Sequence, residues 1–189
     1  MKERLKNISV HLLDLGKRNR LLNYKDNGYR VIDVINEIEK AAENKGKVTG
    51  LSTGFMDLDN MLTGLHGGEL LLVAARPAMG KTAFVLSMAK NMAVNYKTPV
   101  ALFSLEMSNV QLVNRLISNV CEITSDKIKS GQMADYEWQQ LDKRMNLLID
   151  APLYIDDTPS LSVFELRTKA RRLVREHGVK IIIIDYLQL

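Results

Sequence analysis

A glycine, a lysine and a threonine stand in succession at Gly80-Lys81-Thr82, directly after Ala75-Arg-Pro-Ala-Met79. The apolar run Leu70–Ala74 precedes this segment, and an apolar periodicity typical of a helix follows from Ala83. The first N–H groups of such a helix are unpaired and carry partial positive charge, which favours an anion. The segment therefore predicts a loop that binds the phosphates of a nucleoside triphosphate.

Each residue type in this loop has a chemical reason to be there. Gly80 lets the backbone approach the ligand, Lys81 can reach the β- and γ-phosphates, and the Thr82 hydroxyl can complete the coordination of Mg²⁺. The generic pattern G-x-x-x-x-G-K-[ST] begins with glycine, whereas this chain has Ala75. An ordinary strand-to-helix turn is the alternative interpretation. The predicted nucleotide-binding residues are Arg76, Pro77, Ala78, Met79, Gly80, Lys81, Thr82 and Ala83.

Two carboxylates follow apolar runs that are typical of buried parallel strands. Asp185 ends the run Lys180–Ile184, and Glu106 comes shortly after Val100–Ser104. Ligands bind at the carboxyl ends of strands in open α/β sheets. Asp185 could hold Mg²⁺, usually through a water, and Glu106 could polarise the water that attacks the γ-phosphate. The alternatives are a polar strand terminator for Asp185 and a solvated loop charge or helix cap for Glu106.

Short apolar runs alternate with longer amphipathic stretches after Leu51, and these elements must position the groups above. Such alternation predicts an α/β fold with a mostly parallel sheet. Strands are expected at about Leu70–Ala75, Val100–Ser104, Leu153–Asp156 and Lys180–Asp185. Helices are expected at about Lys81–Asn95, Asn109–Cys121, Tyr136–Ile149 and Val163–His177. Capping signals support three helix ends, at Ser108, at Ser162 with Glu165, and at Gly178.

The N-terminal part of the chain differs in character. Residues 1–28 have the pattern of a basic amphipathic helix, interrupted by Gly16 and broken at Asn27-Gly28. A second helical pattern over Val31–Ala42 ends in a polar stretch, so residues 29–48 are expected to be a linker helix with its linker. Neither helix can bury its apolar stripe alone, so both must dock on another surface. Residues 49–189 form the α/β domain.

The amino-acid composition limits the classes of protein to which this chain can belong. The 189 residues are 46% hydrophobic and 25% charged, which is typical of a soluble globular protein. The single Cys121 excludes an internal disulfide, and three scattered histidines offer no zinc-ligand spacing. No apolar run is long enough to span a membrane, and Met1-Lys-Glu-Arg lacks a secretory signal, so we expect a cytoplasmic protein without a membrane partner. The net charge of +4 is compatible with a polyanionic partner without requiring one.

Several motifs follow one another in order: Thr49–Phe55 with Asp57–Asp59, Gly67–Leu70, Ala74–Phe84, Phe103–Ser108, Tyr154–Pro159 and Asp185–Gln188. Together they resemble the motor domain of bacterial replicative DNA helicases of the DnaB type, over about Tyr29 to Leu189. Ala75 is usual in that family. The resemblance implies a RecA-like P-loop fold, hydrolysis of ATP with Mg²⁺, and a homohexamer that moves along single-stranded DNA. It also implies contact with primase or a helicase loader.

The same resemblance implies roles for individual residues. Lys81 contacts phosphate, Thr82 and Asp185 serve Mg²⁺, Glu106 activates water, and Gln188 lies near the γ-phosphate as a sensor. The implied catalytic residues are thus Glu106, Lys81 and Asp185. The helix at Val31–Ala42 resembles the linker helix that docks on the adjacent subunit.

Two departures from the family qualify this expectation. The family's motor domain continues beyond the Asp-Tyr-Leu-Gln motif into DNA-binding loops and an arginine finger, whereas this sequence ends at Leu189. The family's N-terminal helical domain is absent, and Leu12–Tyr24 is similar instead to the opening of an unrelated domain on large superfamily 1 helicase-like proteins. We therefore expect residues 49–189 to be a partial RecA-like domain in which Ile181–Ile184 lacks one neighbouring strand. A nucleotide-binding remnant without helicase activity and a RecA-like regulatory or recombination ATPase remain as alternatives.

Overall fold

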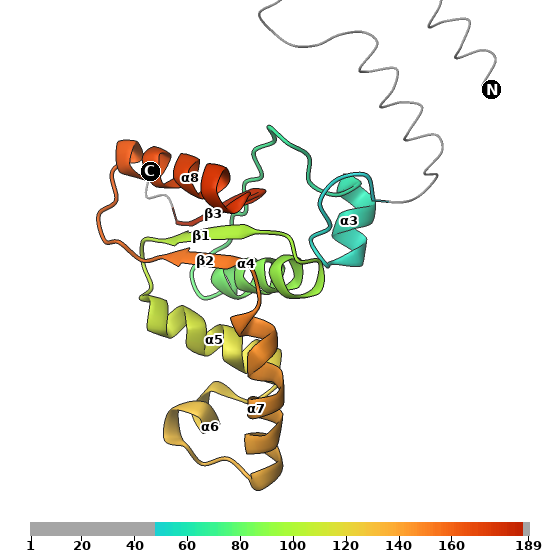
Figure 1. The fold of residues 1–189 in the computed structure, drawn as a ribbon, viewed down its shortest axis with the longest axis vertical. Helices are drawn as coiled ribbons and strands as arrows, with labels where there is room; N and C mark the ends of the chain where they lie inside the picture. Colours follow the sequence, from blue (N-terminus) through green and yellow to red (C-terminus); the bar gives the residue numbers. More distant parts are fainter. Residues whose placement is uncertain (1–47, 187–189) are drawn as a thin grey trace, which may run out of the picture. The chain divides into compact units, whose positions relative to one another are not determined.

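The computed structural model describes residues 48–186, and from Gly50 onward they belong to one compact unit. Three parallel strands form the sheet in the order β2-β1-β3 (Figure 1): β1 (Val100–Ser104), β2 (Leu153–Asp156) and β3 (Ile181–Asp185). Val100 of β1 lies opposite Leu153 on one side and Ile181 on the other. The predicted α/β fold with a parallel sheet is confirmed. The predicted N-terminal helices and most of the linker lie outside the described residues.

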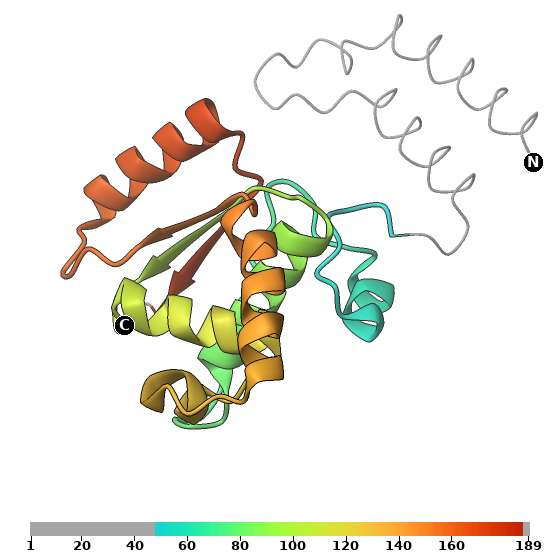
Figure 2. The same ribbon diagram turned by 60° about the horizontal axis from the view of Figure 1, so that its bottom comes forward.

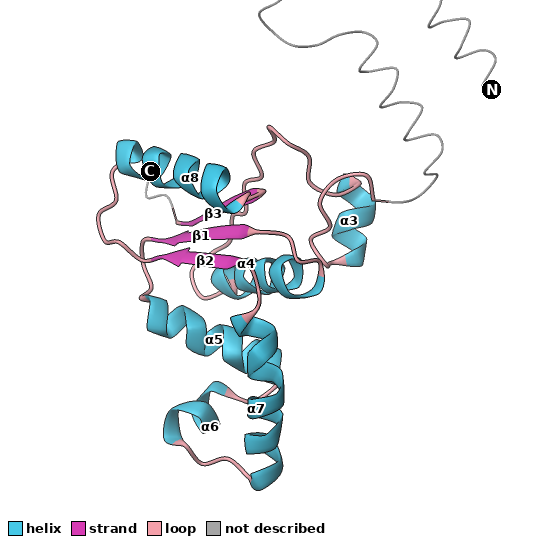
Figure 3. Cartoon of the chain, in the orientation of Figure 1, coloured by secondary structure: helices cyan, strands magenta, loops and turns pink. Residues whose placement is uncertain are grey.

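Helices cover both faces of this sheet (Figure 2). Helices α4 (Lys81–Lys90) and α5 (Asn109–Cys121) lie on one face, and α8 (Val163–His177) lies on the other. Helix α4 continues into one π-helical segment, η2 (Asn91–Asn95), so the predicted helix Lys81–Asn95 is present with a changed last turn. The remaining helices in Figure 3 are α3 (Met56–Leu62), α6 (Ser125–Ser130) and α7 (Asp135–Ile149).

The hydrophobic core centres on β1, every residue of which is buried. Side chains alternate across a strand, so Val100 and Leu102 face the α4–α5 side while Ala101 and Phe103 face α8. A strand covered on both faces reads as a continuous apolar run, which is why Val100–Phe103 was recognisable from the sequence.

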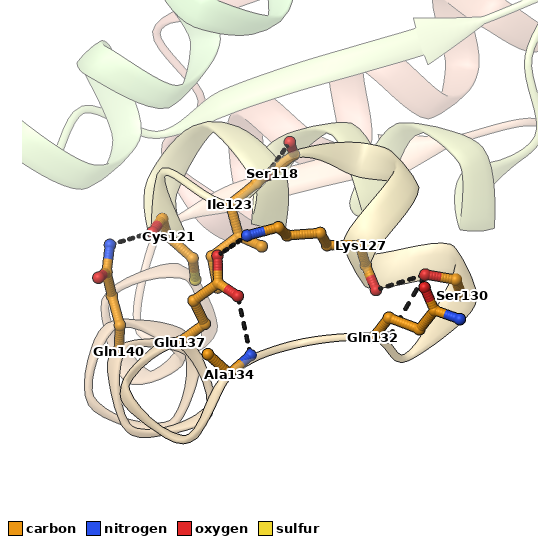
Figure 4. Close-up of polar contacts among 9 residues, drawn as sticks. All are labelled: Ser118, Cys121, Ile123, Lys127, Ser130, Gln132, Ala134, Glu137 and Gln140. Carbon is orange, nitrogen blue, oxygen red and sulfur yellow. Dashed lines mark hydrogen bonds and ion pairs between the residues drawn. The ribbon is translucent and has the colours of Figure 1, made fainter.

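A second apolar cluster holds α5, α6 and α7 together around Val120, Cys121 and Ile123. Polar contacts close it (Figure 4): Lys127 Nζ lies 2.6 Å from Glu137 Oε1, and Glu137 Oε2 accepts the Ala134 N–H at 2.9 Å. The Lys127 hydrogen bond holds the pKa of Glu137 below its ordinary value. Burial raises the pKa of the Cys121 thiol, so this cysteine is a packing residue with little thiolate character.

The predicted strand at Leu70–Ala75 is wrong for the structure, which has no β-ladder there. A strand needs a hydrogen-bonding neighbour, and β3 pairs only with β1 among the described residues. Leu70 is consequently 93% exposed. Two short helices, α3 and α6, were not predicted, because neither is long enough to show a full apolar period.

Candidate functional site

The loop before α4 makes a tight turn that leads directly into the helix. A turn closes at its centre, where the Met79 N–H donates to Arg76 O at 3.2 Å and Ala78 has a φ of 63°. Gly80 follows in the left-handed region, with φ 88° and ψ 17°, as the N-cap of α4. No side-chain cap is present at this helix start, so its first N–H groups remain available to an anion.

Lys81 and Asp185 meet at this loop although they are far apart in the sequence. Lys81 opens α4 and Asp185 ends β3, and the Lys81 Nζ lies 3.0 Å from Asp185 Oδ1. The Asp185 side chain is only 6% exposed. Lys81 Nζ also lies 4.0 Å from the centre of the Tyr186 ring. The structure therefore places the predicted phosphate ligand and the predicted metal carboxylate in direct contact.

Glu106 lies at the same edge of the sheet as Asp185. Ser104 is the register partner of Asp185, and the Leu105 N–H donates to Asp185 O at 2.8 Å. The Ser104 hydroxyl then fixes the following turn, because it donates to Met107 O at 2.7 Å and accepts the Met107 N–H at 3.1 Å. Glu106 occupies this turn and is exposed. It is therefore exposed to solvent close to the carboxyl end of β1.

The remaining predicted residues divide into loop backbone and metal donors. Arg76, Pro77, Ala78, Met79 and Ala83 are exposed, while Thr82 is half-buried in the first turn of α4. Gln188 lies outside the described residues. Hard oxygen donors suit Mg²⁺, which is commonly held by one or two protein oxygens together with phosphates and waters. Thr82 and Asp185 fit that donor set. No larger group of His, Cys, Asp or Glu side chains that could hold a metal occurs within residues 48–186.

Asp59 is a residue whose role the sequence pattern did not assign. Its carboxylate accepts hydrogen bonds from Ser52 Oγ at 2.5 Å, from Thr53 N at 2.8 Å and Oγ1 at 2.7 Å, and from Gly54 N at 3.2 Å. Burial raises the pKa of Asp59, but these hydrogen bonds outweigh burial and leave the pKa below its ordinary value. An aspartate flanked by Ser-Thr-Gly a few residues upstream was the available signal.

We call the Asp59 carboxylate with its donors Ser52, Thr53 and Gly54 the carboxylate box. It supports the helix that carries Lys81. The Asn91 side-chain amide donates to Gly54 O at 3.4 Å, and the Phe55 and Phe84 rings stack with their centres 5.0 Å apart. A methyl group at Gly54 would come within 2.5 Å of Asn91 Cβ. Segment 52–59 therefore supports α4 from behind, whereas it contributes no group to the phosphate loop.

Comparison with known families matches residues 50–189 to the DnaB-like helicase C terminal domain. Among curated relatives, the replicative DNA helicase DnaB of Nostoc sp. strain PCC 7120 is 45% identical over 160 residues, which cover 82% of this chain and 18% of that protein. DnaB of Geobacillus stearothermophilus is 39% identical over 178 residues, covering 94% of this chain and 39% of that protein. The chain thus spans well under half the length of these relatives.

Solved structures agree on the fold. One solved ATPase domain superposes with a TM-score of 0.78 at 34% identity, covering 86% of this chain and 58% of that one. A DnaB-like replicative helicase, described with its interactions with primase, superposes with a TM-score of 0.76 at 30% identity, covering 97% of this chain and 46% of that one. Within the described residues, no helix is both long and apolar enough to cross a membrane.

Proposed function

Because the chain belongs to the family of DnaB-like helicase C-terminal domains, we propose that it carries the ATP site of a replicative DNA helicase motor. In this proposal, hydrolysis of ATP drives movement along single-stranded DNA. The observation that carries it is the meeting of Lys81 with Asp185 at the uncapped start of α4. The two groups have the chemistry needed to bind a phosphate chain and its metal, and they come from separate elements.

The residues of the loop divide the work as follows. The N–H groups at the start of α4 and the Lys81 ammonium bind the β- and γ-phosphates, which compete with Asp185 for the lysine. Thr82 and Asp185 would hold Mg²⁺, and that ion, when bound, neutralises charge that develops on the phosphates. Glu106 accepts a hydrogen bond from the attacking water and orients it toward the γ-phosphate. Lys81, Glu106 and Asp185 are the proposed catalytic residues.

The partners of the proposed motor are ATP, single-stranded DNA, further copies of the same chain in a hexamer, and primase or a helicase loader. A solved relative is described with primase, which supports the last of these. The proposed location is cytoplasmic. We retain the division into residues 1–28, a linker helix with its linker at 29–48, and a RecA-like domain at 49–189.

A nucleotide-binding protein without helicase activity is the second candidate. It is favoured by the segment that leads into the phosphate loop, since Leu70 is exposed and no strand of the described residues pairs with this segment. A phosphate loop that no strand leads into can bind phosphate while failing to hold the geometry that hydrolysis needs.

The experiment measures calorimetric binding of Mg²⁺-ATP and the rate of ATP hydrolysis with and without single-stranded DNA. Lys81→Ala should weaken binding about 10-fold to 100-fold, because a charge-assisted contact to phosphate is lost. Lys90→Ala, at the other end of α4, is the matched control and should bind like the wild-type chain. DNA-stimulated hydrolysis supports the motor, whereas binding without hydrolysis supports the second candidate. Equal binding by the wild-type chain and Lys81→Ala would remove both.

A further inference from the structure

The turn that carries Glu106 lies between the carboxyl ends of the two outer strands. Ser104 ends β1 and is the register partner of Asp185, which ends β3. On the other side of β1, β2 ends at Asp156, one register position before Ser104. The next residue is Asp157. The ends of β2 and β3 therefore flank the point at which the chain leaves β1 and turns through Glu106 toward α5.

The start of this turn is held from the β3 side. The Leu105 N–H donates to Asp185 O at 2.8 Å. The Ser104 hydroxyl then bonds to both the N–H and the carbonyl oxygen of Met107. These contacts fix the backbone on either side of Glu106, but they end two residues before α5 begins at Asn109.

The far end of the turn is held from the β2 side by Asp157. Its Oδ2 atom accepts the Asn109 N–H at 2.6 Å, although the two residues are 48 positions apart in the sequence. Asn109 is the first residue of α5, so its N–H is one of those that a helix leaves without an internal partner. A carboxylate is also favoured there by the partial positive charge of the helix start. The turn is thus held at both ends, by separate strands.

The segment around Asp157 is itself fixed by α8. Asp156 lies on the α8 side of the sheet, where its Oδ2 atom is 2.6 Å from Lys169 Nζ, and Lys169 also donates to Thr158 Oγ1 at 2.6 Å. Burial raises the pKa of Asp156, but its hydrogen bonds with Lys169 and Thr158 outweigh burial and leave the pKa below its ordinary value. Lys169 therefore holds the residues on both sides of Asp157, whose side chain reaches α5 on the other face.

We propose that Asp157 is a positioning residue that fixes the turn carrying Glu106 from the β2 side. The proposal rests on the proposed function, in which Glu106 orients the attacking water. Glu106 stands three residues before Asn109, so a shift at the start of α5 moves its carboxylate, and a displacement of about 1 Å can cost roughly 100-fold in rate. Asp157 contacts a backbone N–H of the chain itself, so nucleotide binding should not depend on it.

Two substitutions remove this hydrogen bond from opposite sides. Asp157→Ala removes the acceptor, and Asn109→Pro removes the donor. Proline is well tolerated at the first position of a helix. Ser108 already has the extended backbone that a residue before proline requires, with φ −69° and ψ 154°. Asn109→Ala loses the same side chain but keeps the N–H, so a comparison of the proline and alanine variants isolates the N–H.

Two further variants complete the set. Asp157→Asn keeps an acceptor oxygen of similar shape but loses the charge. Asp142→Ala removes an exposed carboxylate on α7 and is the control for the change in net charge.

The first measurements are steady-state hydrolysis of ATP and calorimetric binding of Mg²⁺-ATP by the full 189-residue chain. Asp157→Ala should lower kcat about 10-fold while the nucleotide Kd stays within about 2-fold. Asn109→Pro should lower kcat about as much relative to Asn109→Ala. The double variant should lose about 10-fold and not about 100-fold, because both substitutions remove one hydrogen bond. Asp157→Asn should lose no more than about 3-fold, since it keeps a neutral acceptor. Asp142→Ala should stay within about 2-fold of wild type.

Amide hydrogen exchange examines the turn independently of activity. The Met107 N–H is hydrogen-bonded to Ser104, and its exchange should become about 5-fold faster in Asp157→Ala and in Asn109→Pro. It should be unchanged in Asp142→Ala. Urea unfolding separates positioning from stability, because a purely stabilising role would lower the unfolding midpoint and leave kcat unchanged.

The proposal is overturned if Met107 exchanges equally fast in the wild type and Asp157→Ala, if Asp157→Ala lowers kcat no more than Asp142→Ala does, or if the losses multiply in the double variant. Weakened nucleotide binding by Lys81→Ala together with an unchanged kcat in Asp157→Ala would support the ATP site and remove only the role of Asp157. If the wild-type chain bound nucleotide without hydrolysis, the proposed motor would fail, and exchange at Met107 would still decide whether Asp157 fixes the turn.

Discussion

Lys81 Nζ lies 3.0 Å from Asp185 Oδ1, so the lysine that is proposed to bind phosphate is neutralised by the carboxylate that is proposed to hold Mg²⁺. In the chain without nucleotide, Lys81 and Asp185 bind each other and not the ligands proposed for them. A nucleotide must draw Lys81 away from a carboxylate whose side chain is almost fully buried. The free energy needed to break this ion pair therefore reduces the affinity of the chain for nucleotide.

Replacing Asp185 by Asn should separate these two roles. Without the carboxylate, Lys81 is released, and binding of ATP in the presence of a chelator should become equal or tighter by up to about 10-fold. The advantage that Mg²⁺ gives to binding should shrink, because the negative charge of the carboxylate that is proposed to hold the metal is lost. Calorimetric titrations with and without Mg²⁺ measure both effects. An unchanged dependence on Mg²⁺ would argue against Asp185 as the metal carboxylate.

Substitution of Gly54 should destabilise the fold strongly. Gly54→Ala places a methyl group about one bond length too close to Asn91 and forces alanine to φ 80°. Overpacking and the left-handed backbone together should cost about 2–4 kcal/mol of the free energy of unfolding. Gly67→Ala is the matched control, since nothing lies within 4 Å of a methyl group there. Urea unfolding of both variants makes the comparison, and similar midpoints would contradict the packing seen at Asn91.

The carboxylate box at Asp59 should give stability a specific pH dependence. Hydrogen bonds lower the Asp59 pKa below its ordinary value of 3.8, so their contribution is fully present above that pH. It is lost as the pH falls through the lower pKa of the folded chain. Asp59→Asn should cost about 2–4 kcal/mol at neutral pH, because several donors lose a charged acceptor. It should also flatten the decline of stability below about pH 4.

Urea unfolding of the wild type and Asp59→Asn at a series of pH values checks this. Asp57→Asn, on the same helix, is the control, since Asp57 is exposed. If Asp59→Asn declined with pH as steeply as the wild type, the acid sensitivity would come from another carboxylate.

The ion pair between Lys127 and Glu137 should control access to Cys121. Both residues help to close the cluster in which this thiol is buried (Figure 4). Lys127→Met should lower the cost of local opening only modestly, because the lysine is partly exposed and the pair is screened by solvent. The rate at which a thiol reagent modifies Cys121 should rise about 5-fold. Lys129→Met, at an exposed neighbouring position, should leave the rate unchanged. Faster modification in both variants would point to a general loosening of α6.

Helices α5 and α8 begin and end at the predicted residues because their signals are local. The Ser108 N–H donates to Gln111, Ser162 and Glu165 bond to each other, and Gly178 ends α8 with φ 65°. The strand at Leu70–Ala75 could not be judged in this way, since a strand exists only when another strand pairs with it. The apolar residues of this segment indicate only that it could form a strand next to a suitable partner strand.

The candidate site likewise has one part that the local sequence determines and another part that depends on tertiary contacts. Gly80 and its neighbours were predictable because one short segment both makes the turn and starts the helix. The contact between Lys81 and Asp185 depends on how β3 is placed next to β1, and the Asp59 box depends on a tight fold of residues 52–59. The residue types were visible in the sequence, whereas the contacts between these residues depend on the tertiary fold and could not be predicted from it.

A structure of the chain with a non-hydrolysable ATP analogue and Mg²⁺ tests the central claim most directly. We expect the β- and γ-phosphates on the N–H groups at Gly80, Lys81 and Thr82, with Lys81 Nζ moved from Asp185 to a phosphate oxygen and Asp185 and Thr82 turned toward the metal. A nucleotide bound elsewhere, with the loop empty and Lys81 still 3.0 Å from Asp185, would contradict it.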